Sequence, residues 1–217
     1  MSRMLGTEIV GVVLAGGRST RMGGREKAFL ALAGKPMLAH VLKCFAPQVA
    51  RVAINANGDS ERFAAFGLPV IGDPLPDHPG PLAGILAALR WAASQGTDRV
   101  ATVSSDAPFI PPDLVARLAE ASAAAHGTIA VARSVEQVHP LAALWPLGIA
   151  DDLERALATG ERRVQRWVEM QGMTAVDFDP IGVEGRSIDP FLNVNTPADL
   201  AEAETLMQLL QSREALT

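Results

Sequence analysis

Apolar runs that alternate with helix-like stretches are the feature that most constrains how this chain folds. The first run, residues 9–14, is rich in β-branched side chains and leads into glycines, as a buried strand before a loop does. Further runs lie at 49–56, 68–71 and 99–103, and helical stretches lie at 36–46, 60–66, 81–94 and 111–125. Strand alternating with helix implies parallel strands joined by right-handed crossovers. The sequence therefore predicts an α/β fold, doubly wound, with a mainly parallel central sheet and helices on both faces.

The second half of the chain has a less regular pattern. Expected strands lie at 128–133, 141–145, 174–178 and 191–194, and expected helices at 149–158, 162–170 and 196–210. Thr196 followed by Pro197 and Asp199 is typical of a capped helix start. Because no repeat or linker interrupts the chain, we expect a single domain at 8–212 with halves at 8–125 and 126–212. Residues 1–7 and 213–217 are expected to be flexible ends.

Charge and composition exclude several classes of function. The chain has 217 residues, with 24 acidic against 19 basic side chains and a net charge of −5, which argues against a surface for nucleic acid or membrane. The single cysteine, Cys44, excludes an internal disulfide and a cysteine metal cluster. No apolar run approaches the ~20 residues of a membrane span. We expect a cytoplasmic protein that binds neither nucleic acid nor membrane.

Polar residues follow the expected strands of the first half. Asn55 follows the second strand, Asp73 the third and Asp106 the fourth. In parallel sheets, ligands bind where loops leave the carboxyl ends of the strands. These positions therefore predict one site at one edge of the sheet.

The loop after the first strand has the composition of a phosphate-binding turn. Its paired glycines let the backbone approach a ligand and present N–H groups to phosphate oxygens, and Arg21 and Lys27 can neutralise charge. The loop matches neither the P-loop nor the dinucleotide fingerprint. Taken alone, the glycines fit a tight strand-to-helix turn better than a ligand site.

Several motifs together resemble a known family. The first loop resembles the signature of nucleotidyltransferases with a Rossmann-like fold, through Leu14-Ala15-Gly16-Gly17, Arg21-Met22-Gly23 and Lys27. Three further matches resemble the molybdenum cofactor guanylyltransferases: Gly80-Pro81-Leu82-Ala83-Gly84, the segment 105–114 that begins Ser105-Asp106, and Asn193-Val194-Asn195-Thr196-Pro197. The resemblance covers nearly the whole chain, from about Val10 to Leu200.

This resemblance implies a reaction and its substrates. GMP would pass from GTP to the terminal phosphate of molybdopterin, with or without bound molybdenum, and pyrophosphate would leave. The half at 8–125 would then bind the nucleotide and the half at 126–212 the acceptor. Proteins that deliver the molybdenum cofactor are further candidate partners. Two alternatives remain: a sibling enzyme that uses CTP or another NTP, with molybdopterin or another phosphorylated small molecule, and a nucleotide-binding protein that has lost catalysis.

The resemblance also implies roles for single residues. Arg21, Lys27 and Asp106 would be catalytic, and Asp106 would hold Mg²⁺, a hard ion that suits a carboxylate together with nucleotide phosphates. If it stood alone, Asp106 would more simply be a turn or N-cap residue. The implied substrate-binding residues are Leu14, Ala15, Gly16, Gly17, Lys27, Asn55, Asp73, Gly80, Pro81, Leu82, Gly84, Asp106, Asn193 and Asn195.

For the residues that would bind the acceptor, the sequence leaves alternatives open. Asn193 and Asn195 would share a face if residues 191–194 were extended. The run Gly160-Glu161-Arg162-Arg163-Val164 offers two guanidinium groups to a phosphate, or only starts a capped, solvated helix. Asp189 is a candidate second metal ligand.

Overall fold

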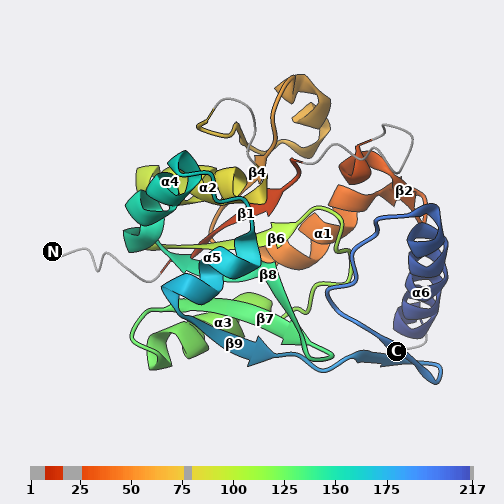
Figure 1. The fold of residues 1–217 in the computed structure, drawn as a ribbon. Coiled ribbons are helices and arrows are strands. Elements are labelled where there is room, and N and C mark those ends of the chain that lie inside the picture. The colour runs from red at the N-terminus through yellow and green to blue at the C-terminus, as the bar shows by residue number, and fades with distance from the viewer. Residues whose placement is uncertain (1–7, 17–25, 76–79, 216–217) are drawn as a thin grey trace, which may run out of the picture.

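A central sheet organises the computed structural model, which describes residues 8–16, 26–75 and 80–215. Within these residues the sheet has seven strands (Figure 1). Their order is β5 (Val70–Ile71), β4 (Val52–Asn55), β1 (Val10–Leu14), β6 (Arg99–Ser104), β8 (Gln137–Pro146), β7 (Ile129–Ser134) and β9 (Met173–Asp177). Only β8 runs antiparallel to its neighbours in this described sheet. The expected α/β class with a mainly parallel sheet is confirmed.

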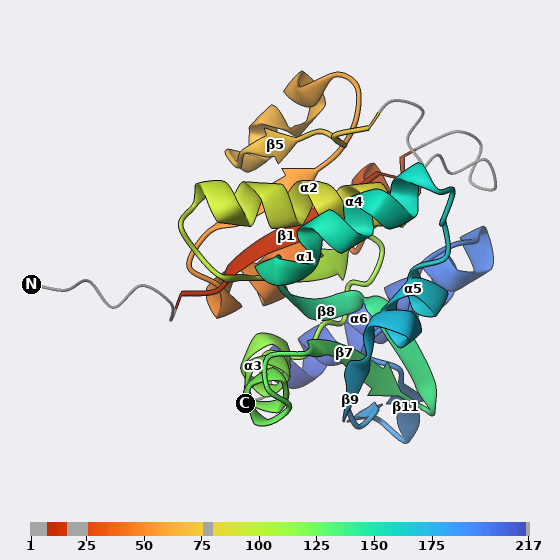
Figure 2. The ribbon, with the colours of Figure 1, turned by 60° about the vertical axis from the view of Figure 1, so that its left-hand side comes forward.

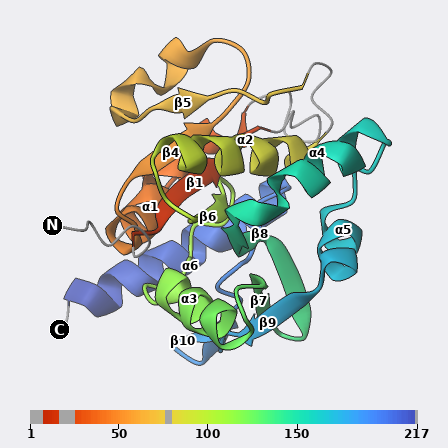
Figure 3. The same cartoon turned by 90° about the vertical axis from the view of Figure 1, so that its left-hand side faces the viewer.

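Helices cover both faces of the sheet (Figures 2 and 3). One face packs against α1 (Met37–Phe45) and α3 (Leu114–Ala124), and the other against α2 (Pro81–Ser94), α4 (Ala150–Ala158) and α5 (Val164–Gln171). Strand β1 shows the reason: Val13 joins the first cluster, whereas Val12 and Leu14 join the second. A strand with both faces buried needs a continuous apolar run, as its sequence has.

A third, smaller core lies beside the sheet. Helix α6 (Pro197–Ala215) packs on the hairpin of β2 (Ala31–Leu32) and β3 (Lys35–Pro36) and stands apart from the sheet in Figure 1. The second hairpin of this core is β10 (Ile181–Val183) with β11 (Arg186–Ile188). Val194 is fully buried here. This core therefore anchors the segment that enters α6.

Gly11 makes room for a core aromatic ring, which yields a prediction. A Cβ atom at Gly11 would lie 2.6 Å from Phe45 Cε1 and 2.9 Å from Val49 Cγ2, and Phe45 is fully buried. We expect Gly11→Val to lower the free energy of unfolding by about 1–3 kcal/mol, because an overpacked core must shift. Urea unfolding measures this. Gly182→Val is the control, since a Cβ at this strand glycine meets nothing within 4 Å; equal losses in both variants would contradict the packing argument.

The structure corrects several expected elements. The expected strand at 191–194 is not formed, because the Asp189 carbonyl accepts from Leu192 N and the chain turns there. The segment 60–66 is a 3₁₀-helix, η4 (Ser60–Phe66), and the helix expected from Pro111 begins at Leu114. Helix α6 continues to Ala215, beyond the expected end near Leu210. In the described residues, no helix has the length and apolar character needed to cross a membrane.

Candidate active site

The carboxyl ends of β1, β4 and β6 lie side by side. Backbone hydrogen bonds continue the ladder past the strands, from Ala15 N to Asn55 O at 2.8 Å and from Ser105 N to Leu14 O at 3.1 Å. The loops that leave these strands therefore start together, as expected for the edge where a parallel sheet binds ligands.

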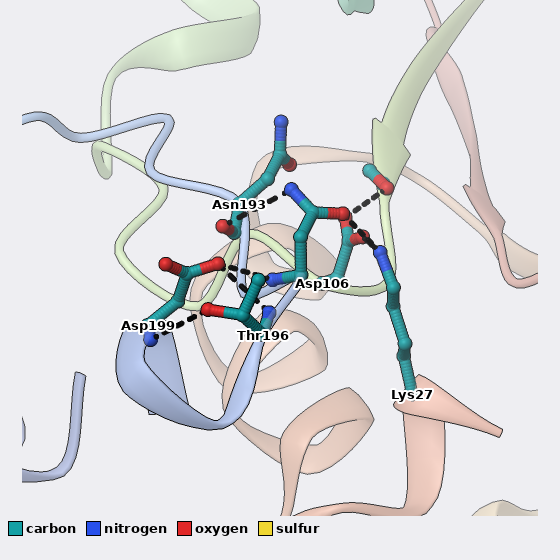
Figure 4. Close-up of polar contacts among 7 residues, drawn as sticks. Lys27, Asp106, Asn193, Thr196 and Asp199 are labelled. Atoms are coloured by element: carbon teal, nitrogen blue, oxygen red, sulfur yellow. Dashed lines mark hydrogen bonds and ion pairs between the residues drawn. The ribbon is translucent and has the colours of Figure 1, made fainter. Parts of the chain in front are cut away.

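Three side chains from distant parts of the sequence meet at this edge (Figure 4). Lys27 Nζ lies 2.7 Å from Asp106 Oδ2 and also donates to Asn195 Oδ1, across 79 and 168 residues of sequence. Ser104 Oγ donates to the other oxygen, Asp106 Oδ1, at 2.5 Å. The Lys27 and Asp106 side chains are 22% and 13% exposed. The site is thus a sheltered cation and carboxylate that a ligand can still reach.

The segment before α6 delivers Asn195 to this site. Val194 N donates to the Asp106 carbonyl at 2.9 Å, so the two loops are directly joined. Asn193 and Asn195 do not share the face of a strand: in Figure 4 the Asn193 side chain points away from Lys27.

Asp199 holds this segment through a helix cap and yields a second prediction. Its Oδ2 accepts from Asn195 N at 2.8 Å and Thr196 N at 2.9 Å, and Asp199 N donates to Thr196 Oγ1 at 3.2 Å. Hydrogen bonding from Asn195 N–H is the main cause that lowers the pKa of Asp199. A lowered pKa stabilises the fold above the unfolded-state value near 3.9, and this stability is lost as pH falls through the folded-state pKa.

We therefore expect Asp199→Asn to destabilise the protein more at pH 7 than at about pH 3, since the stability that the lowered pKa provides declines once pH falls below the unfolded-state value near 3.9. Urea unfolding of both proteins at the two pH values measures the difference. Glu202→Gln, an exposed carboxylate on the same helix, is the control. A destabilisation by Asp199→Asn that does not change with pH would contradict this role.

Asn55 and Asp73 lie together at the ends of β4 and β5. Asn55 Nδ2 donates to Asp73 Oδ1 at 2.9 Å and to the Ile71 carbonyl at 3.1 Å. Asn57 completes this group: its Nδ2 donates to Asp73 Oδ2 at 2.7 Å, and its Oδ1 accepts from Asp73 N at 2.8 Å. Sequence reasoning missed Asn57, although Asn55-Ala56-Asn57 repeats the spacing of Asn193-Val194-Asn195.

The first turns of α2 lie against Asn55 of the same group. Gly80 has φ +90°, which favours glycine, and Pro81 takes the first helical position, where it needs no N–H partner. A Cβ atom at Gly84 would lie 2.4 Å from Asn55 Oδ1. Only a glycine at 84 lets Asn55 keep its present position, while Leu82 is buried behind it.

The first loop is described only in part. Leu14 ends β1, Ala15 is half-buried and Gly16 is exposed, and a Cβ atom at Gly16 would lie 3.8 Å from Asn55 Oδ1. Gly17 and the expected catalytic residue Arg21 lie outside the described residues.

A cavity of about 640 Å³ adjoins the Asp106 loop. Its walls come from the first half of β8, the first turns of α5, and the loops after β6 and before α6. Ser104, Ala107 and Asn193 line the end beside Asp106, and Arg162, Arg163 and Arg166 line the α5 side. The cavity therefore extends from the sequence neighbours of Asp106 to three arginines.

The run at 160–164 leads into α5. Glu161 Oε1 accepts from Arg162 N at 2.8 Å and Arg163 N at 2.9 Å, and these bonds lower the pKa of Glu161. Both donors precede the helix, and α5 has no side-chain hydrogen bond from its N-cap Arg163, so the expected capped start is not formed. Arg162 and Arg163 both line the cavity.

Asp189 does not join Asp106. Its Oδ1 accepts from Ser134 Oγ at 2.5 Å and from Phe191 N at 2.9 Å. Across the described part of the chain, no three His, Cys, Asp or Glu side chains gather as a metal cluster. Asp106 fits a metal in another way, because Mg²⁺ is commonly held by one or two carboxylates plus substrate phosphates.

The fold and this site define a class. A mainly parallel sheet that gathers the start of a glycine loop, a lysine and a strand-end aspartate at one edge is the arrangement of an α/β nucleotidyltransferase. The model of the MobA-like NTP transferase domain matches residues 11–175, and the chain belongs to this family.

Close relatives carry a more specific name. A protein of Mesorhizobium japonicum named molybdenum cofactor guanylyltransferase is 45% identical over 207 residues, which are 94% of this chain and 99% of the relative. One of Sinorhizobium fredii with the same name is 47% identical and covers 92% of each chain. These matches confirm the resemblance seen in the motifs.

Solved structures share the fold. The molybdopterin-guanine dinucleotide biosynthesis protein A of Archaeoglobus fulgidus has a TM-score of 0.72 at 24% identity and covers 92% of this chain and 99% of its own. A 4-diphosphocytidyl-2C-methyl-D-erythritol synthase of Anaerococcus prevotii has a TM-score of 0.70 at 11% identity, covering 93% and 96%.

Proposed function

We propose that this protein transfers GMP from GTP to the terminal phosphate of molybdopterin, with or without molybdenum, and releases pyrophosphate. The observation that carries the proposal is the meeting of Lys27, Asp106 and Asn195 next to a cavity that is lined by their neighbours Ser104, Ala107 and Asn193 and by three arginines. The relatives named molybdenum cofactor guanylyltransferase support the choice of reaction.

The reaction requires the protein mainly to position the two substrates and to neutralise their negative charge. A terminal phosphate oxygen of the acceptor forms a bond to the α-phosphorus of GTP, and the bond from that phosphorus to the pyrophosphate oxygen breaks. Because the attacking oxygen is already ionised, no general base is needed. Lys27 and Arg21 would neutralise phosphate charge and hold the reacting groups in line.

Asp106 is the residue that would hold Mg²⁺. Its carboxylate lies just after the end of β6 and beside Lys27, and a hard divalent cation suits that donor. Bound there, Mg²⁺ would supply further charge neutralisation at the phosphates.

The nucleotide is assigned to residues 8–125. Leu14, Ala15, Gly16 and Gly17 would present backbone N–H groups to the phosphates. Asn55 and Asp73 offer amide and carboxylate groups to the ribose hydroxyls and to the N1–H and N2–H₂ donors of guanine. Backbone at Gly80, Pro81, Leu82 and Gly84 would contact the base, because the glycines allow close approach.

The acceptor is assigned to residues 126–212. Arg162 and Arg163 can meet a phosphate in the cavity, and Asn193, which also lines the cavity, offers a further polar contact. We also propose a cytoplasmic enzyme that exchanges substrate or product with proteins that deliver the molybdenum cofactor.

The deciding experiment compares nucleotides. The protein is incubated with Mg²⁺, molybdopterin and GTP, CTP, ATP or UTP in turn, and pyrophosphate and the dinucleotide product are measured. We expect turnover with GTP that stops when EDTA removes the metal. Turnover with CTP and none with GTP would establish the alternative sibling enzyme, and binding of GTP without turnover would favour a non-catalytic protein.

Gly84 tests the nucleotide assignment separately. We expect Gly84→Ala to raise the KM for GTP about tenfold, because the new Cβ would displace Asn55 from Asp73 and a factor of ten equals only ~1.4 kcal/mol. Gly148→Ala is the matched control, since a Cβ there meets nothing within 4 Å. Unchanged GTP kinetics in Gly84→Ala would remove Asn55 from the nucleotide site.

A further inference from the structure

Ser134, His139 and Asp189 form a polar cluster at the wall of the cavity. Ser134 Oγ lies 2.7 Å from His139 Nε2 and 2.5 Å from Asp189 Oδ1. Ser134 is 2% exposed and His139 is 9% exposed, and His139 lines the cavity. Burying a polar side chain costs free energy unless it finds a hydrogen-bond partner. We therefore ask what this cluster of three polar side chains does.

The donors and acceptors of the cluster can be assigned. The Asp189 carboxylate only accepts, so Ser134 donates its one hydroxyl proton to Asp189. His139 Nε2 must then donate to Ser134 Oγ, which requires the tautomer protonated at Nε2. Burial lowers the pKa of His139, although the Asp189 carboxylate and Ser134 act in the opposite direction. The cluster is not a nucleophilic triad, because here histidine gives a proton toward serine and does not accept one.

The hairpin of β7 and β8 creates this contact, and an irregularity follows it. Val131 pairs with Ala143, but the next residue, Ala132, pairs with His139, so residues 140–142 bulge out of β8. The turn at Val135-Glu136 pairs Ser134 with Gln137 and Ala132 with His139, which puts Ser134 and His139 on one face of the hairpin. The bulge beyond His139 makes residues 140–142 part of the cavity wall, as bulges near sites commonly do.

The cluster holds the segment that enters α6. Asp189 Oδ1 also accepts from Phe191 N, and the His139 ring packs on the Phe191 ring with centroids 4.9 Å apart. Phe191 is 2% exposed and is held on another side by Phe178. Asn193 follows two residues later on the cavity wall.

We propose that His139 is a positioning residue: through Ser134 and Asp189 it fixes the segment 189–193, so that Asn193 is held on the wall of the acceptor cavity. The role in acceptor binding rests on the proposed function. Asn55 and Asp73, which are proposed to bind the nucleotide, lie at the ends of β4 and β5 and not on this segment. Loss of the cluster should therefore weaken acceptor binding and leave GTP binding unchanged.

Two variants of His139 test this with wild-type kinetics as reference. His139→Leu lacks the donor, whereas the side-chain amide of His139→Gln can still donate to Ser134. We expect His139→Leu to raise the KM for molybdopterin about tenfold or more, as for a buried hydrogen bond left unmade, with kcat within about twofold and the Kd for GTP unchanged. His139→Gln should restore most of the loss. An unchanged KM in His139→Leu, equal losses in both variants, or an equal loss of GTP binding would overturn the proposal.

A second measurement does not depend on the substrate. In ¹⁵N-labelled protein, histidine ring correlations should show His139 protonated at Nε2, and amide exchange at Phe191 should be faster in His139→Leu than in wild type or His139→Gln. A ring protonated only at Nδ1, or unchanged exchange at Phe191, would overturn the positioning role. A wild type that shows these signals without transferring GMP to molybdopterin would instead refute the proposed function, and with it the acceptor-specific part of this inference.

Discussion

Asp106→Asn is expected to abolish GMP transfer while the protein stays folded. The substitution keeps the size of the side chain and its contact with Ser104, but removes the charge that pairs with Lys27 and that would hold Mg²⁺. Removing one preorganised electrostatic group costs about 10²–10³ in kcat, and a lost metal site costs at least as much. Pyrophosphate release with GTP and molybdopterin measures the loss. Thermal unfolding checks the fold.

Asp113→Asn is the matched control for this prediction. Asp113 precedes α3 on the same connection as Asp106, is exposed, and lies 3.7 Å from Arg117. The same change of charge should leave its activity unchanged. If Asp106→Asn keeps wild-type activity, Asp106 has no part in the reaction or in metal binding.

The sequence predicted best those elements whose signals are local. Helix α2 has the expected bounds, Pro81–Ser94, because a glycine and a proline mark its start and Gly96 follows its end. Strands β1, β4 and β6 follow from their apolar runs, since strands buried on both faces need them. The site residues at the ends of these strands could be expected together for the same reason.

The short hairpins were not predicted, although two carry a turn signal. Ala33-Gly34 and Glu184-Gly185 have positive φ at both positions, which is typical of two-residue hairpin turns that end in glycine. Val135-Glu136 has the same conformation with no glycine, so the turn between β7 and β8 has no such signal. Strands of two or three residues are also too short for their alternation to be seen.

Contacts between residues far apart in the sequence are the part of the site that the sequence did not predict. The expected strand at 191–194 was wrong because a backbone turn at Asp189 and a bond from Val194 N to Asp106 shape this segment. Ser134 and His139 meet because the turn at Val135-Glu136 pairs Ser134 with Gln137 and Ala132 with His139, and this turn contains no glycine to signal it. The motif at 193–197 indicated that this segment belongs to the site, but it did not indicate that Asn195 contacts Lys27.

Lys27→Met is expected to lower kcat/KM for GTP about 10²–10³-fold, because the variant loses a fixed cation beside the phosphates. Lys27→Arg should recover little: the ammonium group contacts Asp106 and Asn195 at once in a sheltered place, and a planar guanidinium is larger and donates in other directions. Lys35→Met is the control, as an exposed lysine in the hairpin that follows. Initial rates at varied GTP concentration measure each variant.

The double variant separates a shared role from two independent ones. Lys27 and Asp106 are in direct contact, so their losses should not add: Lys27→Met combined with Asp106→Asn should be scarcely slower than Asp106→Asn alone. This follows if both groups hold the same triphosphate in one geometry, since losing either already releases it. If instead the fold-losses in rate of the two single variants multiply in the double variant, Lys27 acts on the nucleotide independently of Asp106. The ion pair between them would then exist only in the enzyme without substrate.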